Sequence, residues 1–137
     1  MEWNLEIKIK PQGKERPRVN TMTRQAYTPH KTKFYEETIK YMFLHKYGSK
    51  NEPSAKEIAM KIIATFEPPK SMSKKKRQEL IDGEFGYLHK PDSDNIAKAV
   101  LDSLNKIVYK DDSQVANLLV IKKYGAEDKI EIEIKEI

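Results

Sequence analysis

Apolar and polar residues alternate along three stretches of the chain, residues 3–9, 58–66 and 130–134. Alternation with a period of two is typical of strands that bury one face. A fourth stretch, residues 114–123, contains the run Leu-Leu-Val-Ile and is predicted to be a well-buried strand. Residues 14–27 have little periodicity, so we expect a loop or an irregular hairpin there.

Three helices are predicted between these strands. Thr28 before Pro29 is typical of a helix start, with Thr28 as the N-cap, and Gly48 is typical of a helix end, which predicts a helix over residues 29–47. Its expected buried residues are Tyr35, Ile39, Met42 and Phe43. Ser73 and Gly83 bracket a short helix over residues 74–82. A third helix is expected over about residues 95–106, with an apolar stripe formed by Ala97, Val100, Leu101, Leu104 and Val108.

The order of these elements is strand, loop, helix, strand, helix, helix, strand, strand. It predicts an α+β fold, a mixed β-sheet with helices packed on it. A length of 137 residues indicates one domain over residues 1–137. The chain has no cysteine, which excludes disulfides and thiolate metal sites. It also has no apolar stretch near 18 residues, so secretion and membrane spanning are not expected, and we expect a cytoplasmic protein.

The net charge of +5 is unevenly distributed along the chain. Residues 1–50 contain 11 basic and 5 acidic residues, whereas residues 91–137 contain 7 basic and 10 acidic residues. Such segregation suggests that one part of the chain contacts a polyanion and another holds a cation.

The acidic residues concentrate in the segment from Lys90 to Val115. Asp92 and Asp94 lie at the predicted start of the third helix, where the helix dipole favours ionised carboxylates. If the strand that follows the helix pairs beside this helix start, Asp112 lies close to Asp92 and Asp94. Three converging carboxylates need a cation, and oxygen ligands without Cys or His select Mg²⁺ or Mn²⁺.

Each of these acids also has an ordinary structural interpretation. An aspartate near a helix start is usually a cap, and Asp111 with Asp112 before a strand is typical of a solvated turn. Lys98 and Asp102 are spaced as a common surface ion pair. The clustering of these acids at two positions of a basic chain favours catalysis. The three histidines, His30, His45 and His89, are scattered in the sequence and are assigned no catalytic part.

The run PDSDNIAKAVLDSLNKIVYKDDSQV resembles the signature of the RusA-type Holliday junction resolvases, including prophage-encoded members. The segments KERPRVNTMTRQAYTPHKT and PPKSMSKKKR follow the order of that family. The resemblance implies a RusA-like fold and a homodimeric, Mg²⁺-dependent endonuclease that nicks four-way DNA junctions symmetrically in recombination and repair. By the same resemblance, Asp92, Asp94 and Asp112 match the metal-binding acids and Lys98 the essential lysine; Asp111 is the alternative third ligand.

Basic residues are frequent in two other segments and are candidates for DNA phosphate contacts. They are Lys14, Arg16, Arg18, Arg24, Lys31, Lys74, Lys75, Lys76 and Arg77. Phe85 and Tyr87 are candidates for stacking on unpaired bases, although core packing is expected for at least one. Two other functions fit the same residues. One is a non-catalytic nucleic-acid-binding protein, and the other is a Mg²⁺-dependent phosphoryl- or nucleotidyl-transfer enzyme, which the lack of a glycine-rich phosphate loop disfavours.

Overall fold

The computed structural model describes residues 1–15, 18–27, 29–48, 50–83 and 85–137. Its main sheet has four strands in the order β1-β6-β4-β5. Their bounds are β1 Glu2–Ile7, β4 Ile58–Phe66, β5 Val115–Tyr124 and β6 Lys129–Glu136. β6 pairs antiparallel with both β1 and β4, whereas β5 pairs parallel with β4. The predicted mixed sheet is confirmed.

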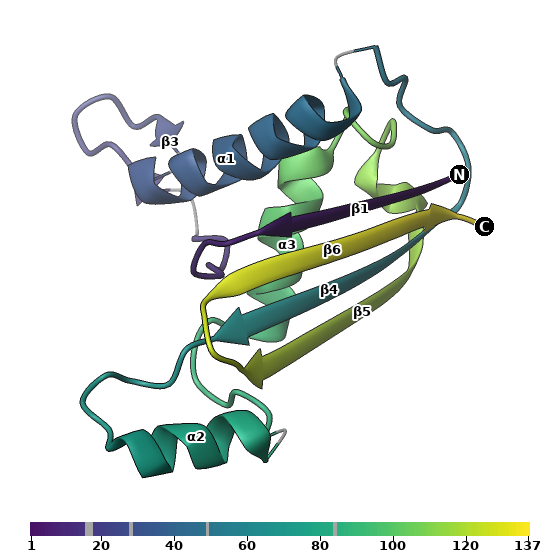
Figure 1. Ribbon diagram of the computed structural model, residues 1–137. Helices are drawn as coiled ribbons and strands as arrows, with labels where there is room; N and C mark the ends of the chain where they lie inside the picture. The colour runs from purple at the N-terminus through teal and green to yellow at the C-terminus, as the bar shows by residue number, and fades with distance from the viewer. Residues whose placement is uncertain (16–17, 28, 49, 84) are drawn as a thin grey trace.

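Two long helices cover one face of this sheet, α1 (His30–Tyr47) and α3 (Ser93–Leu104) (Figure 1). The shorter α2 (Lys74–Asp82) lies beyond the sheet, near the ends of β4 and β5 (Figure 1). A small hairpin pairs β2 (Arg18–Val19) with β3 (Ala26–Tyr27), which confirms an irregular hairpin in this region. None of the described helices is long and apolar enough to cross a membrane.

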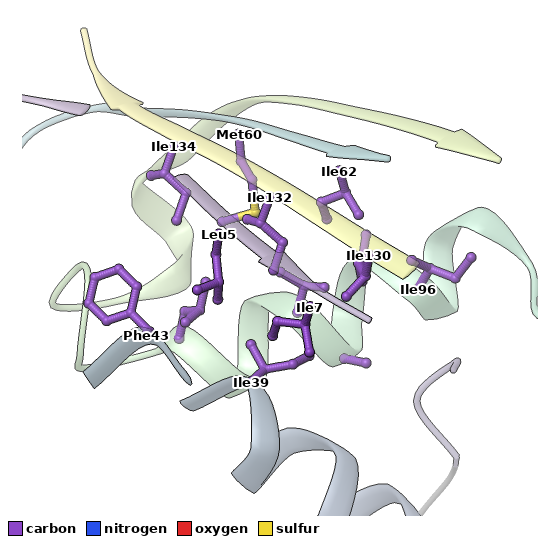
Figure 2. Packing of buried hydrophobic residues seen from close by; sticks show 14 of the residues in the cluster. Leu5, Ile7, Ile39, Phe43, Met60, Ile62, Ile96, Ile130, Ile132 and Ile134 are labelled. Atoms are coloured by element: carbon purple, nitrogen blue, oxygen red, sulfur yellow. The ribbon is translucent and has the colours of Figure 1, made fainter. Parts of the chain in front are cut away.

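The core lies between the sheet and the two helices. Alternate residues of β4 and β6, such as Ile62 and Ile132, point from the sheet to the helices and are buried (Figure 2). Ile39 and Phe43 of α1 meet them from the other side (Figure 2). Burial of this apolar area is the main stabilising contribution of the fold.

The helix predictions hold with small shifts. Gly48 ends α1 with a positive φ of 83°, and Ser73 caps α2 through a hydrogen bond from the Lys76 amide. The expected cap Thr28 lies outside the described residues. The third helix was expected from residue 95 but begins at Ser93, because the chain before it is extended up to the cap position Asp92.

The prediction for residues 114–123 is wrong in one respect. The segment does form a strand, but β5 is at an edge of the sheet and is largely exposed. Leu118 and Leu119 are 41% and 50% exposed. A continuous apolar run is typical of a central strand, and here the same pattern occurs on a strand with only one neighbour.

The packing of the core predicts that truncating a side chain at its centre strongly lowers the free energy of unfolding. We expect Ile62→Ala to lower the free energy of unfolding by about 2–5 kcal/mol, because Ile62 is fully buried and its removal leaves a cavity. Met22→Ala, at an exposed position, should change it by less than about 0.5 kcal/mol. Urea denaturation measures both, and similar losses in the two variants would contradict the proposed core.

Candidate active site

Two carboxylates stand at the start of α3. Asp92 occupies the N-cap position but its side chain makes no capping hydrogen bond, and Asp94 lies in the first turn. Both side chains are exposed, and neither has a hydrogen bond or ion pair within the described parts of the chain. They are therefore free to bind a cation from solvent.

Lys98 and Asp102 continue this row along α3 at helical spacing. Lys98 Nζ lies 3.7 Å from Asp102 Oδ2, and its side chain is mostly exposed. An exposed pair of this kind contributes little to stability, about 0.3–0.5 kcal/mol. The ammonium of Lys98 is thus only loosely held and remains accessible one turn beyond Asp94.

The ammonium of Lys14 is largely buried, unlike those of the exposed basic candidates. It lies between Glu36 of α1 and Asp102 of α3, at 3.2 Å from Asp102 Oδ2. Burial disfavours the charged form, but the hydrogen bonds and charges of Glu36 and Asp102 outweigh it and raise the pKa of Lys14. The positive charge of Lys14 is therefore balanced by two carboxylates of the protein. The position of Lys14 indicates a structural link between the N-terminal loop and both helices.

The loop before Lys14 lies directly against the start of α3. The Lys14 amide donates a hydrogen bond to the Asn95 carbonyl, at 2.9 Å. A Cβ on Gly13 would lie only 2.8 Å from Pro91 Cβ and 3.0 Å from Asn95 Cβ. Only glycine allows this close approach. The loop thus helps to fix the backbone that holds Asp92 and Asp94.

The third acidic position follows α3 and precedes β5. Asp111 caps the short 3₁₀ helix η1 (Asp112–Gln114) by accepting a hydrogen bond from the Ser113 amide, at 3.0 Å. The hydrogen bonds from Ser113 lower the pKa of Asp111. Gln114 completes this capping box and also donates to the carbonyls of Ser54 and Lys56. Asp111 is thus engaged in the turn.

The side chain of Asp112 has no hydrogen bond or ion pair within the described residues, although its carbonyl accepts a hydrogen bond from the Val115 amide. The pKa of Tyr109 is raised by burial and additionally by the negative charges of Asp112, Asp102 and Asp111. Of the two adjacent acids, Asp112 is therefore the one with a carboxylate left for a ligand.

The three predicted metal ligands do not meet within one chain. α3 runs from the C-terminal ends of β4 and β5 to the start of β5, so Asp112 lies near the end of the helix (Figure 1). Twelve helical residues span about 18 Å, which separates Asp112 from Asp92 and Asp94. No group of three His, Asp or Glu side chains able to hold an ion occurs among the described residues. The condition for convergence, a strand starting beside the helix start, is not met.

The basic candidates fall into several groups. Lys74, Lys75 and Lys76 are exposed on the first turn of α2, whereas Arg77 donates to Glu67 at 2.8 Å and is partly buried. Arg24 and Lys31 are exposed near the β2–β3 hairpin and the start of α1. Arg18 begins β2, and Arg16 lies outside the described residues. The three exposed lysines of α2 form the densest group of unpaired cations in the described chain.

The segment 85–89 connects α2 to the start of α3 along the end of β5. Tyr87 stacks on Phe66 with ring centroids 3.8 Å apart, which confirms core packing for this aromatic residue, and Lys122 lies over its ring. Phe85 remains 56% exposed. Core packing was expected for at least one of Phe85 and Tyr87, and Tyr87 is the one that packs, but the pairing of this segment with β5 has no signal in the sequence pattern.

Comparison with known proteins identifies the family. The family model described as endodeoxyribonuclease RusA matches residues 8–135. The chain belongs to the RusA family. The uncharacterized protein YqaN of Bacillus subtilis (strain 168) is similar to it, with 32% identity over 131 residues that cover 92% of this chain and 89% of YqaN. The RusA match spans both the N-terminal loop and the acidic segment, so the residues described above all lie within it.

The contact at Gly13 generates a prediction. We expect Gly13→Ala to lower the free energy of unfolding by about 1–3 kcal/mol, because the added methyl group overlaps Pro91 and Asn95. Gly86→Ala is the matched control, since its Cβ would meet only ordinary contacts of 3.7 Å or more. Chemical denaturation of both variants tests this, and a neutral Gly13→Ala would show that the loop does not press on the start of α3.

Proposed function

We propose that this RusA-family protein is a Mg²⁺-dependent endodeoxyribonuclease that acts on four-way DNA junctions as a homodimer, one nick per subunit, in DNA recombination and repair. The observation that carries the proposal is the family match over residues 8–135, which includes the two unengaged carboxylates of Asp92 and Asp94. The chemistry of these donors suits a hard divalent cation, with Mn²⁺ as a substitute.

The donor set of a single chain is incomplete for such an ion. Asp92 and Asp94 supply two carboxylates, whereas Asp112 lies at the other end of α3. We therefore assign to this chain's residues only what their positions support. Asp92 and Asp94 bind the cation, and the exposed ammonium of Lys98 attracts a DNA phosphate beside them.

DNA binding is assigned to the exposed lysines of α2, with Arg24 and Lys31 as further contacts. Cations in the first turn of a helix are opposed by the helix dipole, so a phosphate partner offsets an unfavourable arrangement. Contacts to phosphate give affinity without reading sequence, which suits an enzyme that selects a branched shape.

The catalytic assignment predicts the effect of one substitution. We expect Asp94→Asn to reduce cleavage of a synthetic mobile four-way junction in Mg²⁺ by at least about 100-fold, while junction binding is retained or tightened because a negative charge is removed. Glu133→Gln, an exposed carboxylate-to-amide change on β6, should cleave like the wild type. Gel assays of cleavage and binding give both readouts, and full activity of Asp94→Asn would remove the proposed site.

The binding assignment predicts a change in salt dependence. Replacing Lys74, Lys75 and Lys76 together by alanine should reduce the slope of log affinity against log salt by about 2–3 for a junction substrate. Alanine at Lys8, Lys61 and Lys135, three cations elsewhere on the surface, is the matched control and should leave the slope nearly unchanged. Equal losses of slope in the two triple variants would show that α2 is not a specific contact.

A further inference from the structure

A row of ring side chains runs along the outward face of α1. It is formed by His30, Phe34, Tyr41 and His45, whose spacings of four, seven and four residues place them on one side of the helix. All four are exposed, Phe34 to 69% and Tyr41 to 65%, and the buried residues of α1 lie on the opposite side. We call these four residues the ring row. A contiguous exposed group of this kind typically marks a binding surface.

The fold itself does not require rings at these positions. Aromatic residues and histidine are weaker helix formers than alanine, and here they contribute nothing to the core. The rings of Tyr41 and His45 stack on each other, with centroids 6.0 Å apart and planes 19° from parallel. The neighbouring aliphatic residues Met42 and Leu44 are only partly exposed. The surface therefore presents ring faces rather than an aliphatic groove.

The charges beside the ring row are mainly positive. Lys31, Lys33 and Lys40 are exposed on α1, and their ammonium groups have no ion pair within the part of the chain that the structure describes. Glu37 is an exposed acid on this side, whereas Glu36 is turned to Lys14. Three cations against one acid favour an anionic partner.

The ring row has a defined end and length. After His45, the side chains of the helix turn to β1: Lys46 Nζ donates to the Asn4 carbonyl at 2.8 Å, and the Asn4 amide donates to Tyr47 Oη at 2.8 Å. From His30 to His45 the helix rises about 22 Å, which corresponds to about six nucleotides of one strand at 3.4 Å each. Single-strand sites of this size are common in proteins.

We propose that the ring row binds a single strand of DNA, with bases stacked on the rings and phosphates beside the lysines. Every base has a face that stacks on an aromatic ring, but in a duplex the neighbouring base pairs cover these faces. A partner protein that docks a helix requires an aliphatic groove instead, which this face lacks. The choice of DNA follows from the family match.

The ring row begins at the same end of the molecule as the candidate active site. α1 begins where β1 ends, and α3 begins where β4 and β5 end (Figure 1). Lys14 joins the two helices at this end, because its amide donates to the Asn95 carbonyl and its ammonium contacts Glu36. A strand on the ring row therefore leads towards the start of α3. A branched DNA with one unpaired arm can occupy both surfaces; this extension rests on the proposed function, whereas binding of a single strand does not.

The first test separates ring faces from apolar area. Fluorescence anisotropy of a labelled 20-residue oligothymidine, measured in EDTA at low salt, should show binding by the wild type. The double variant Phe34→Leu, Tyr41→Leu keeps apolar side chains but removes two ring faces, so its affinity should fall by about 10- to 100-fold. Phe34→Tyr with Tyr41→Phe is the matched control and should bind like the wild type.

Both pairs of substitutions lie at exposed positions, and circular dichroism should show the wild-type fold in both variants. No binding by the wild type, or equal binding by the leucine variant, would overturn the inference. Equal binding by the leucine variant is also the result expected if the ring row contacts another protein.

Photo-cross-linking locates the strand directly. An oligothymidine that carries 5-iododeoxyuridine should attach to the rings on irradiation, and mass spectrometry of a tryptic digest should find the label on peptides 34–40 and 41–46. Label found only on other peptides would contradict the proposed position.

Salt dependence tests the lysines. Lys33→Ala with Lys40→Ala should reduce the slope of log affinity for oligothymidine against log salt by about 1.4. Lys61→Ala with Lys135→Ala, two cations of β4 and β6, is the matched control and should leave the slope nearly unchanged. Equal changes in the two double variants would show that the lysines of α1 do not contact the strand.

A binding comparison in EDTA tests the extension to branched DNA. The wild type should bind a four-way junction with one single-stranded arm about 10-fold more tightly than an all-duplex junction, and the leucine variant should bind both alike. Equal affinities in the wild type would overturn the extension. If the wild type cleaves no junction in Mg²⁺, the proposed function fails, while the oligothymidine result still decides the role of the ring row.

Discussion

The parallel pairing of β4 with β5 determines where the three candidate acids lie. A parallel neighbour requires a crossover, and α3 provides it by running back across the sheet. The residues that begin the helix and those that follow it must then lie at opposite ends of the strands. Asp92 and Asp94 are separated from Asp112 for this reason, although all three belong to one short sequence segment. The described structure therefore does not bring the three acids together.

The N-terminal loop belongs to the same arrangement. Lys14 joins Glu36 of α1 to Asp102 of α3, and Gly13 allows the loop to lie against Pro91. Two ionic contacts from one partly buried ammonium hold three segments in a fixed relation. The basic N-terminal part of the sequence thus has two roles. Part of it organises the start of α3, and part of it remains exposed to solvent.

Much of the fold could be predicted because its signals are local. Alternation identified β4 to the residue, and the caps Ser73 and Gly48 identified helix ends. Local patterns carry no information on which strand lies at an edge, so the apolar run of β5 was taken for a buried strand. The acids of the candidate site were selected for their chemistry, but their separation depends on strand order. Lys14 was assigned to DNA because it lies in a basic segment, and its ion pairs with Glu36 and Asp102 could not be foreseen because both partners are distant in sequence.

The cover that α1 places over β1 has a consequence for assembly. Tyr47 and Lys46 occupy the backbone of Asn4, so that side of the sheet accepts no further strand. Side chains at the end of α1 that satisfy the backbone of an edge strand protect it against pairing with another chain and so oppose aggregation.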